Sequence, residues 1–213
     1  MQHQRAFCIK PEYQHRLQNQ FFDDTSLRDE WQNEVYQSAA KAATEMAAQT
    51  IVDVGCGSAF KLIKFFNNLR TVGLDLEPTI QFLRKTYPEK EWKVSDFGKP
   101  LQGRYDIVIC SDVVEHIPNP DVLMQYLDAI RFRKLFISTP DRPLVYGYDQ
   151  LGPPGNKAHC REWSFEEFND YVSQWFDIKE HRITNRMQST QMIVAVKRPA
   201  FKKLLYKFSQ LSR

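Results

Sequence analysis

The stretch of sequence that decides the fold is TIVDVGCGSAFK, residues 50–61. Its apolar residues Ile51, Val52 and Val54 are typical of a short buried strand. The glycine turn Gly55-Cys56-Gly57 follows, and the residues after it predict a helix. Because glycine has no Cβ, backbone N–H groups in such a turn can approach a ligand closely. Open α/β sheets bind small ligands outside the carboxyl ends of their strands, so we expect a ligand at this turn.

Two residues around the turn indicate which ligand binds there. A dinucleotide-binding turn has a third glycine three residues after the second, and this chain has Phe60 at that position. Asp53 lies two residues before the first glycine, where its carboxylate would repel a pyrophosphate and attract a cationic amino-acid end. These features disfavour NAD and FAD. They favour S-adenosylmethionine, which carries no phosphate.

The turn resembles motif I of the class I S-adenosylmethionine-dependent methyltransferases, D-x-G-x-G-x-G, with Ala59 in place of the last glycine. Further family motifs follow in the same order up to about residue 196. The resemblance implies a Rossmann-like α/β fold: a seven-stranded, mostly parallel sheet with helices on both faces and an antiparallel last strand, forming a three-layer sandwich. It assigns residues 49–198 to one S-adenosylmethionine-binding domain.

Acidic residues at the ends of the next two expected strands complete the predicted cofactor site. Asp75 ends the second strand, 22 residues after Asp53, where its carboxylate can accept hydrogen bonds from both ribose hydroxyls. The alternative for Asp75 is a helix N-cap. Asp96 and Phe97 match the family's adenine-binding position after the third strand, and the alternative is a simple aspartate turn. The predicted cofactor-binding residues are Asp53, Gly55, Gly57, Asp75, Leu76, Asp96, Phe97 and Ser111.

Candidate acceptor residues follow the fourth expected strand and lie in a long loop. The sequence SDVVEHIP, residues 111–118, resembles the family's motif IV and the Glu-His-Ile segment that borders the methyl acceptor. Residues 142–163 form a Gly- and Pro-rich loop, whose length is typical of a lid or binding loop. Histidine titrates near neutral pH, so His116 and His159 are candidate general bases. For His116 the alternative is a hydrogen bond to the backbone. The predicted acceptor-binding residues are Asp112, Glu115, Asn156 and Arg161.

Residues 1–48 are predicted to form a helical extension before the domain. Asp24, Thr25 or Ser26 could cap a helix that runs to about Ala48 with an apolar face at helical spacing. One interpretation is a helix packed on the sheet edge. The other is a lid over the cofactor, with Tyr36 or Gln32 facing the ligand.

Length and composition favour a cytoplasmic α/β protein. The chain has 213 residues, enough for one well-buried α/β domain with an appendage. Its first residues lack the apolar core of a signal peptide, and no apolar run reaches the length of a membrane helix. The four cysteines lie far apart without a CxxC pair, so we expect neither a disulfide framework nor a metal site.

The net charge of +3 is unevenly distributed. Six basic residues and no acid follow from Lys197 onward, which leaves −3 for residues 1–196. An acidic body is a poor surface for a phosphate backbone, so nucleic acid is not an expected partner. Residues 199–213 are predicted to form a basic amphipathic tail. This tail could pack on the body or on a partner subunit, as in a homodimer, or it could lie on an anionic membrane surface.

The expected function is in-line transfer of a methyl group from S-adenosylmethionine to a small-molecule or glycan acceptor, at a hydroxyl group. FFDDT at residue 21 and the loop sequence GPPGNKAHCREW resemble a bacterial subgroup. That likeness implies sugars, glycolipids or other small metabolites of surface-polysaccharide or secondary-metabolite pathways as acceptors. Two alternatives stay open: a non-catalytic methyltransferase-like scaffold or partner of a biosynthetic enzyme, and a methyltransferase that modifies protein side chains.

Overall fold

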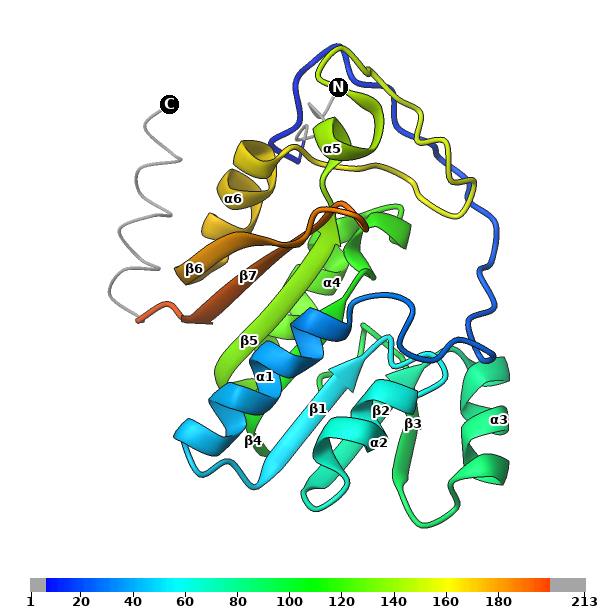
Figure 1. The fold of residues 1–213 in the computed structure, drawn as a ribbon, viewed down its shortest axis with the longest axis vertical. Helices are drawn as coiled ribbons and strands as arrows, with labels where there is room; N and C mark the ends of the chain where they lie inside the picture. The colour runs from blue at the N-terminus through cyan, green and yellow to red at the C-terminus, as the bar shows by residue number, and fades with distance from the viewer. Residues whose placement is uncertain (1–6, 200–213) are drawn as a thin grey trace.

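Seven strands form one sheet in the order β3-β2-β1-β4-β5-β7-β6 (Figure 1) in the computed structural model, which describes residues 7–199. Strands β1 to β5 pair in parallel, and β7 runs antiparallel to both β5 and β6. The expected α/β fold with an antiparallel last strand is therefore confirmed. The strands are β1 Thr50–Val54, β2 Arg70–Asp75, β3 Glu91–Val94, β4 Arg104–Ser111, β5 Arg131–Pro140, β6 Phe176–Asn185 and β7 Thr190–Lys197. The predicted basic tail lies outside the described residues.

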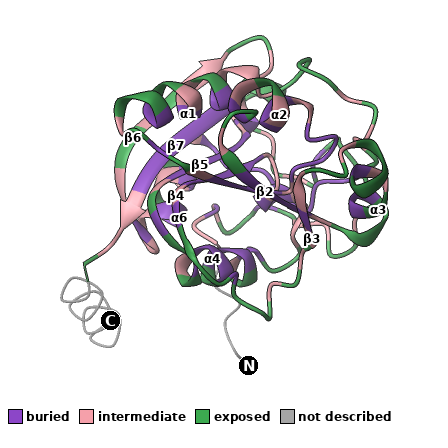
Figure 2. Ribbon diagram, turned by 90° about the horizontal axis from the view of Figure 1, so that it is seen from below, coloured by how far each residue is buried: buried purple, intermediate pink, exposed green. Residues whose placement is uncertain are grey.

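Alternate side chains of each strand enter two cores, one on either face of the sheet. Ile51, Ile107 and Ile109 pack with α1, α2 and α3, whereas Val52 and Val108 face α4 and α6. Figure 2 shows the buried strands lying between these two helical layers. No helix among residues 7–199 combines the length and apolarity needed to cross a membrane. The helices are α1 Asn33–Glu45, α2 Phe60–Phe66, α3 Glu77–Thr86, α4 Pro120–Ala129, α5 Arg142–Tyr146 and α6 Phe165–Ser173, with a 3-10 turn at Val114–His116.

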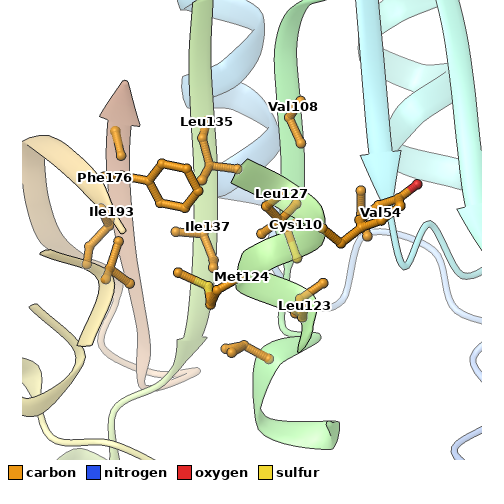
Figure 3. Close-up of a cluster of buried hydrophobic side chains, with 14 of the residues drawn as sticks. Val54, Val108, Cys110, Leu123, Met124, Leu127, Leu135, Ile137, Phe176 and Ile193 are labelled. Atoms are coloured by element: carbon orange, nitrogen blue, oxygen red, sulfur yellow. The ribbon is translucent and has the colours of Figure 1, made fainter. Parts of the chain in front are cut away.

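The core beneath α4 fixes the strand ends that carry the site. Figure 3 shows Cys110 of β4 and Ile137 of β5 beside Leu123 and Leu127 of α4. All four side chains are fully buried. Burial of an aliphatic side chain of this size contributes about 1.5–3 kcal/mol relative to exposure. The segment that follows β4 is therefore anchored to a fully buried core.

The predicted N-terminal helix begins later than the sequence indicated. The structure starts α1 at Asn33, after Gln32 in a left-handed conformation with φ 58°. Residues 19–32, here called the strap, contain no helix and cross the ends of β1 and β2 (Figure 1). Lys61 Nζ of α2 donates to the Arg28 carbonyl at 2.9 Å, and Lys64 pairs with Asp29 at 2.5 Å. These contacts with α2 override the local helix signal.

The long loop after β5 is packed rather than open. Its first residues form α5, and its later residues run beside the N-terminal segment (Figure 1). The Arg16 guanidinium donates to the carbonyls of Pro154, Asn156 and His159 at 2.6–2.7 Å. Backbone hydrogen bonds from Gln14 and Gln20 to the loop add to this contact. The loop therefore holds a defined shape next to the carboxyl ends of the strands.

Candidate active site

A cavity of about 480 Å³ opens at the carboxyl ends of β1, β2 and β4. Strand order reverses between β1 and β4, which is where open α/β sheets bind ligands. The strap covers one side of the cavity, and the segment after β4 forms another. The lining residues are Asn19, Gln20, Phe21, Phe22, Gly55, Asp75, Leu76, Ser95, Phe97, Asp112, Val113, His116 and Ile117.

The glycine turn needs its two glycines for both conformation and space. Gly55 has φ +75°, and a Cβ there would lie 2.3 Å from Val113 Cγ2. Gly57 has φ +51°, and a Cβ there would lie 2.1 Å from Asp24 Oδ2. Ala59, where the resembling family has glycine, is also left-handed with φ 55°. A non-glycine residue in this region costs roughly 1–2 kcal/mol, which explains the preference for glycine at that position.

Asp75 lies in the cavity wall with its carboxylate aligned by the turn. Its Oδ2 accepts from the Gly57 N–H at 2.8 Å, and its Oδ1 accepts from the Leu76 N–H at 2.7 Å. Leu76, rather than Asp75, occupies the N-cap position of α3. Burial raises the pKa of Asp75. The Thr79 side chain also donates a hydrogen bond to this carboxylate. A carboxylate has about four acceptor sites, so one stays available for a ribose hydroxyl.

Asp53 lies behind the turn instead of in the cavity wall. It is fully buried, and the Tyr36 hydroxyl donates to its Oδ2 at 2.9 Å. Its Oδ1 has no hydrogen-bond partner within residues 7–199. Burial raises the pKa of Asp53 to about 7. The lid interpretation expected Tyr36 to face the ligand. In the structure its hydroxyl instead donates a hydrogen bond to this buried acid.

The adenine-binding position is only partly as predicted. Phe97 lines the cavity and packs against Tyr126, with ring centroids 5.2 Å apart. The Asp96 carboxylate instead accepts from the Gly98 N–H at 3.0 Å and pairs with Lys99 at 3.1 Å. Ser95, which sequence reasoning missed, lines the cavity directly after β3.

The two polar residues that end β4 have different positions. Asp112 lines the cavity in a left-handed conformation with φ 53°. Its Oδ1 accepts from Ser138 Oγ at 2.6 Å, and its Oδ2 accepts from Gln32 Nε2 at 2.9 Å. Ser111 is buried, with its Oγ 2.8 Å from Ser138 Oγ. The left-handed conformation of Asp112 costs about 1–3 kcal/mol, and backbone strain of this kind is common at functional sites.

His116 presents one ring nitrogen to the cavity. Its Nδ1 donates to the Ala158 carbonyl at 3.0 Å, the backbone contact weighed from the sequence. No hydrogen bond from any described residue reaches Nε2, and the ring is part of the cavity wall. Phe22 stacks on the ring with centroids 6.4 Å apart. Burial and the neighbouring His159 lower the pKa of His116 to about 4, so the imidazole is neutral at pH 7.

The predicted role of His159 as a direct base is not supported. The side chain is buried and outside the cavity wall. Its Nδ1 lies 2.5 Å from Glu162 Oε1, and its Nε2 lies 3.0 Å from Asn156 Nδ2. Its ring meets that of His116 edge-on with centroids 4.7 Å apart. Both ring nitrogens of His159 already have partners, so neither is open to an acceptor. We interpret His159 as a residue that packs against the His116 ring and holds it in place.

Three predicted acceptor-binding residues also point away from the cavity. Glu115 is fully buried, and its Oε2 accepts from Thr139 Oγ1 at 3.1 Å. Arg161 is 2% exposed and donates to the carbonyls of Ile117 and Pro118 at 2.7 and 2.6 Å. The Asn156 side chain is hydrogen-bonded to His159. Packing of the loop against the N-terminal segment turns these polar groups toward buried backbone and side-chain partners.

The atoms of Glu115, His116 and His159 that could bind a metal lie within 4.8 Å of one another. Both His159 nitrogens and the His116 Nδ1 are already hydrogen-bonded. His116 Nε2 and Glu115 Oε1 remain, which is fewer than the three protein ligands of a typical catalytic zinc site. Hydrogen bonds alone account for the close approach of these three side chains. That the site binds no metal stays a prediction.

The strap residues in the cavity wall were missed by sequence reasoning. Asn19 Nδ2 donates to the carbonyls of His116 and Ala158 at 2.9 and 2.8 Å, which ties the strap to the segment after β4. Phe21 and Phe22 follow and line the cavity. Two adjacent aromatic residues in a polar segment were the available signal. These two residues make this part of the cavity wall apolar.

Residues 13–192 match the model of a family described as "Methyltransferase domain". A curated relative is the mitochondrial ubiquinone biosynthesis O-methyltransferase of Saccharomyces cerevisiae, 26% identical over 132 residues. That match covers 55% of this chain and 42% of the relative, so the chain spans less than half of the relative's length.

Solved structures share the fold. Magnesium protoporphyrin IX methyltransferase from Synechocystis PCC 6803, with bound S-adenosylhomocysteine, has a TM-score of 0.61 at 18% identity, covering 78% of this chain and 83% of that chain. The 1,6-didemethyltoxoflavin-N1-methyltransferase of Burkholderia thailandensis has a TM-score of 0.58 at 18% identity, covering 80% and 82%. At these identities the likeness concerns the fold.

Proposed function

Since the chain belongs to this methyltransferase-domain family and is a methyltransferase that uses S-adenosylmethionine, we propose that it methylates a hydroxyl group. The acceptor is a small molecule or glycan held between the strap and His116. The observation that carries the proposal is the position of the His116 imidazole in the cavity wall, with Nδ1 bound to the Ala158 carbonyl and Nε2 open. A neutral imidazole fixed in this way can accept the proton of a hydroxyl.

The reaction follows from the arrangement of the wall. Phe97 would contact the cofactor's adenine, Asp75 would hold its ribose, and the turn that contains Gly55 would accommodate its methionine end; all three residues line the cavity. The acceptor oxygen attacks the methyl carbon in line with the sulfonium, the C–S bond breaks, and the O–C bond forms. The hydroxyl proton passes to His116 Nε2. Positioning of the two reactants accounts for most of the rate enhancement, because the sulfonium donor is already activated.

The acceptor side favours a small organic molecule. Phe21 and Phe22 of the strap and Ile117 supply apolar surface beside His116. Phe21 and Phe22 are about half exposed, so an apolar acceptor bound against them would remove apolar surface from water. The relative named as an O-methyltransferase supports a hydroxyl acceptor, whereas a structural neighbour named as an N1-methyltransferase shows that the fold also serves nitrogen.

A His116→Gln variant tests the proposal. Protein would be incubated with methyl-labelled S-adenosylmethionine and a deproteinised cell extract, and the label then separated into small-molecule and protein fractions. We expect label in the small-molecule fraction, reduced about 10²–10⁴-fold in His116→Gln, because the general base is lost. Affinity for S-adenosylhomocysteine should change little, since His116 lies on the acceptor side.

His15→Gln is the matched control. His15 also has a pKa lowered to about 4 by burial, but it packs against Tyr13 and Phe7 outside the cavity wall. Its Nδ1 accepts from Arg161 Nε at 3.3 Å, and glutamine keeps an acceptor for this contact. Its labelling rate should stay near wild type. Equal rates for wild type and His116→Gln would overturn the base assignment. Label confined to protein would favour the side-chain alternative, and label in neither fraction despite cofactor binding would favour the scaffold.

A further inference from the structure

Three carboxylates lie around the glycine turn, and the Lys61 ammonium group is near two of them, Asp53 and Asp24. Asp53 lies behind the turn, Asp75 lies in the cavity wall, and Asp24 comes from the strap. The Asp24 carboxylate rests on Gly57, with Oδ2 2.1 Å from where a Cβ would be and Oδ1 3.0 Å away. It occupies space that any residue with a side chain would take. Asp24 therefore faces the turn along which the cofactor's methionine end is expected.

The nearby cation compensates only part of this negative charge. Lys61 Nζ donates to the Arg28 carbonyl at 2.9 Å and lies 5.5 Å from the Tyr36 ring centroid. Its pKa is lowered by burial, so this ammonium is itself poorly solvated. Three acids around the turn and one lysine near two of them leave an excess of acidic groups. Buried charges are stable when paired, so the site is complementary to a cationic ligand.

The pKa values of two of these acids are raised, so a nearby cationic group would favour their ionised forms. Burial, with repulsion from Asp75 as the next cause, raises the pKa of Asp24 to about 6. Burial raises that of Asp53 to about 7. Asp23, the neighbour of Asp24 on the strap, is exposed, and hydrogen bonds from Thr25 lower its pKa. Asp23 is therefore solvated and Asp24 partly buried, although the two residues are adjacent in the sequence.

We propose that Asp24 is a cofactor-binding residue carried on the strap, and that its carboxylate pairs with the α-ammonium group of S-adenosylmethionine beside Gly57. Anchors on both sides position it: Asn19 bonds to the His116 and Ala158 carbonyls, and Gln32 bonds to Asp112. The strap thereby completes the cofactor site from outside the sheet. This inference rests on the family assignment and is independent of the acceptor.

Calorimetric titration with three probes tests the proposal. S-adenosylmethionine and S-adenosylhomocysteine carry the amino-acid end, whereas 5′-methylthioadenosine has the adenosine half alone. Asp24→Asn should weaken binding of the first two by at least about tenfold, because a charge-assisted contact is lost, and should leave 5′-methylthioadenosine unchanged. Asp23→Asn is the matched control and should leave all three affinities unchanged.

The remaining outcomes decide against the proposal. An equal loss for all three probes would mean that Asp24 shapes the whole cavity, and unchanged or tighter binding would mean that it only fills the empty turn. If Asp24→Asn fails to fold, a measurement on the wild-type protein still tests the ammonium contact. Deaminated S-adenosylhomocysteine, which keeps the carboxylate, should bind at least about tenfold more weakly than the parent, and equal affinity would overturn the ammonium contact.

Discussion

At the scale of single residues, Gly55 shows how conformation and space are combined at the turn. Its φ of +75° is a conformation that residues with a Cβ rarely adopt, and Val113 fills the space beside it. Val113 itself lines the cavity next to Asp112. A side chain at position 55 would therefore displace the segment on which both Asp112 and His116 depend.

We predict that Gly55→Ala weakens binding of S-adenosylhomocysteine at least about tenfold and lowers the free energy of unfolding by about 1–3 kcal/mol. Gly147→Ala is the control, because Gly147 also has a positive φ, +89°, but nothing lies within 4 Å of its Cβ position. It should lose stability and keep its affinity. Titration calorimetry and urea denaturation measure the two quantities. Equal affinity in the two variants would show that the contact with Val113 is unimportant.

At the scale of elements, the loop of residues 142–163 has a different role from the one its composition indicated. Its start forms α5, its carbonyls accept hydrogen bonds from Arg16 of the N-terminal segment, and its Arg161 side chain donates to carbonyls of the segment after β4. Arg161 illustrates this role: it donates to two carbonyls, and its guanidinium lies 4.7 Å from the Phe7 ring centroid. The loop therefore supports the wall that contains His116.

We predict that Arg161→Met lowers the free energy of unfolding by about 2–5 kcal/mol, because buried carbonyls lose their donors. Affinity for S-adenosylhomocysteine should stay near wild type. Arg133→Met is the control: Arg133 is half-exposed and pairs with Asp106 at 3.1 Å, so its loss should cost at most about 1 kcal/mol. Urea denaturation of both variants gives the comparison. A weakened acceptor affinity at wild-type stability would instead restore the acceptor-binding role.

At the scale of the whole molecule, the acids around the turn couple cofactor binding to pH. The folded-state pKa values of Asp24 and Asp53 are about 6 and 7, both above the ordinary value of 3.8. The folded protein without cofactor therefore binds protons more tightly than the unfolded chain. The stabilisation is complete below about pH 4 and is lost as the pH rises through 6 to 7. The charged neighbours of both acids are Asp75 and Lys61. Asp23 also acts on Asp24, Asp24 acts on Asp53, and the Tyr36 hydroxyl donates to Asp53.

A cationic cofactor favours the ionised acids, so we predict that binding of S-adenosylmethionine releases protons near pH 6.5. Its affinity should fall as the pH drops from about 7.5 to 5. Calorimetry in two buffers with different ionisation enthalpies measures the proton release. Asp24→Asn should release fewer protons, and Asp23→Asn should match the wild type. Proton uptake, or affinity independent of pH, would contradict the prediction.

Much of the site could be read from sequence because its residues directly follow buried strands. Asp75, Phe97, Asp112 and His116 each lie within a few residues of a strand end, and all four line the cavity. The strap residues could not be found in this way. Local composition favoured a helix through residues 24–32, and contacts with α2 decided otherwise.

The sequence by itself determined the α/β architecture, the glycine turn and the acid at the end of β2, because hydrophobic runs and glycine patterns act over a few residues. The tertiary structure alone decided which polar side chains face the cavity. Arg16 meets the His159 carbonyl across 143 positions of the chain, and Arg161 turns toward carbonyls 44 and 43 positions away. Side-chain direction follows from the buried backbone groups that need partners, and those groups become neighbours only after the chain has folded.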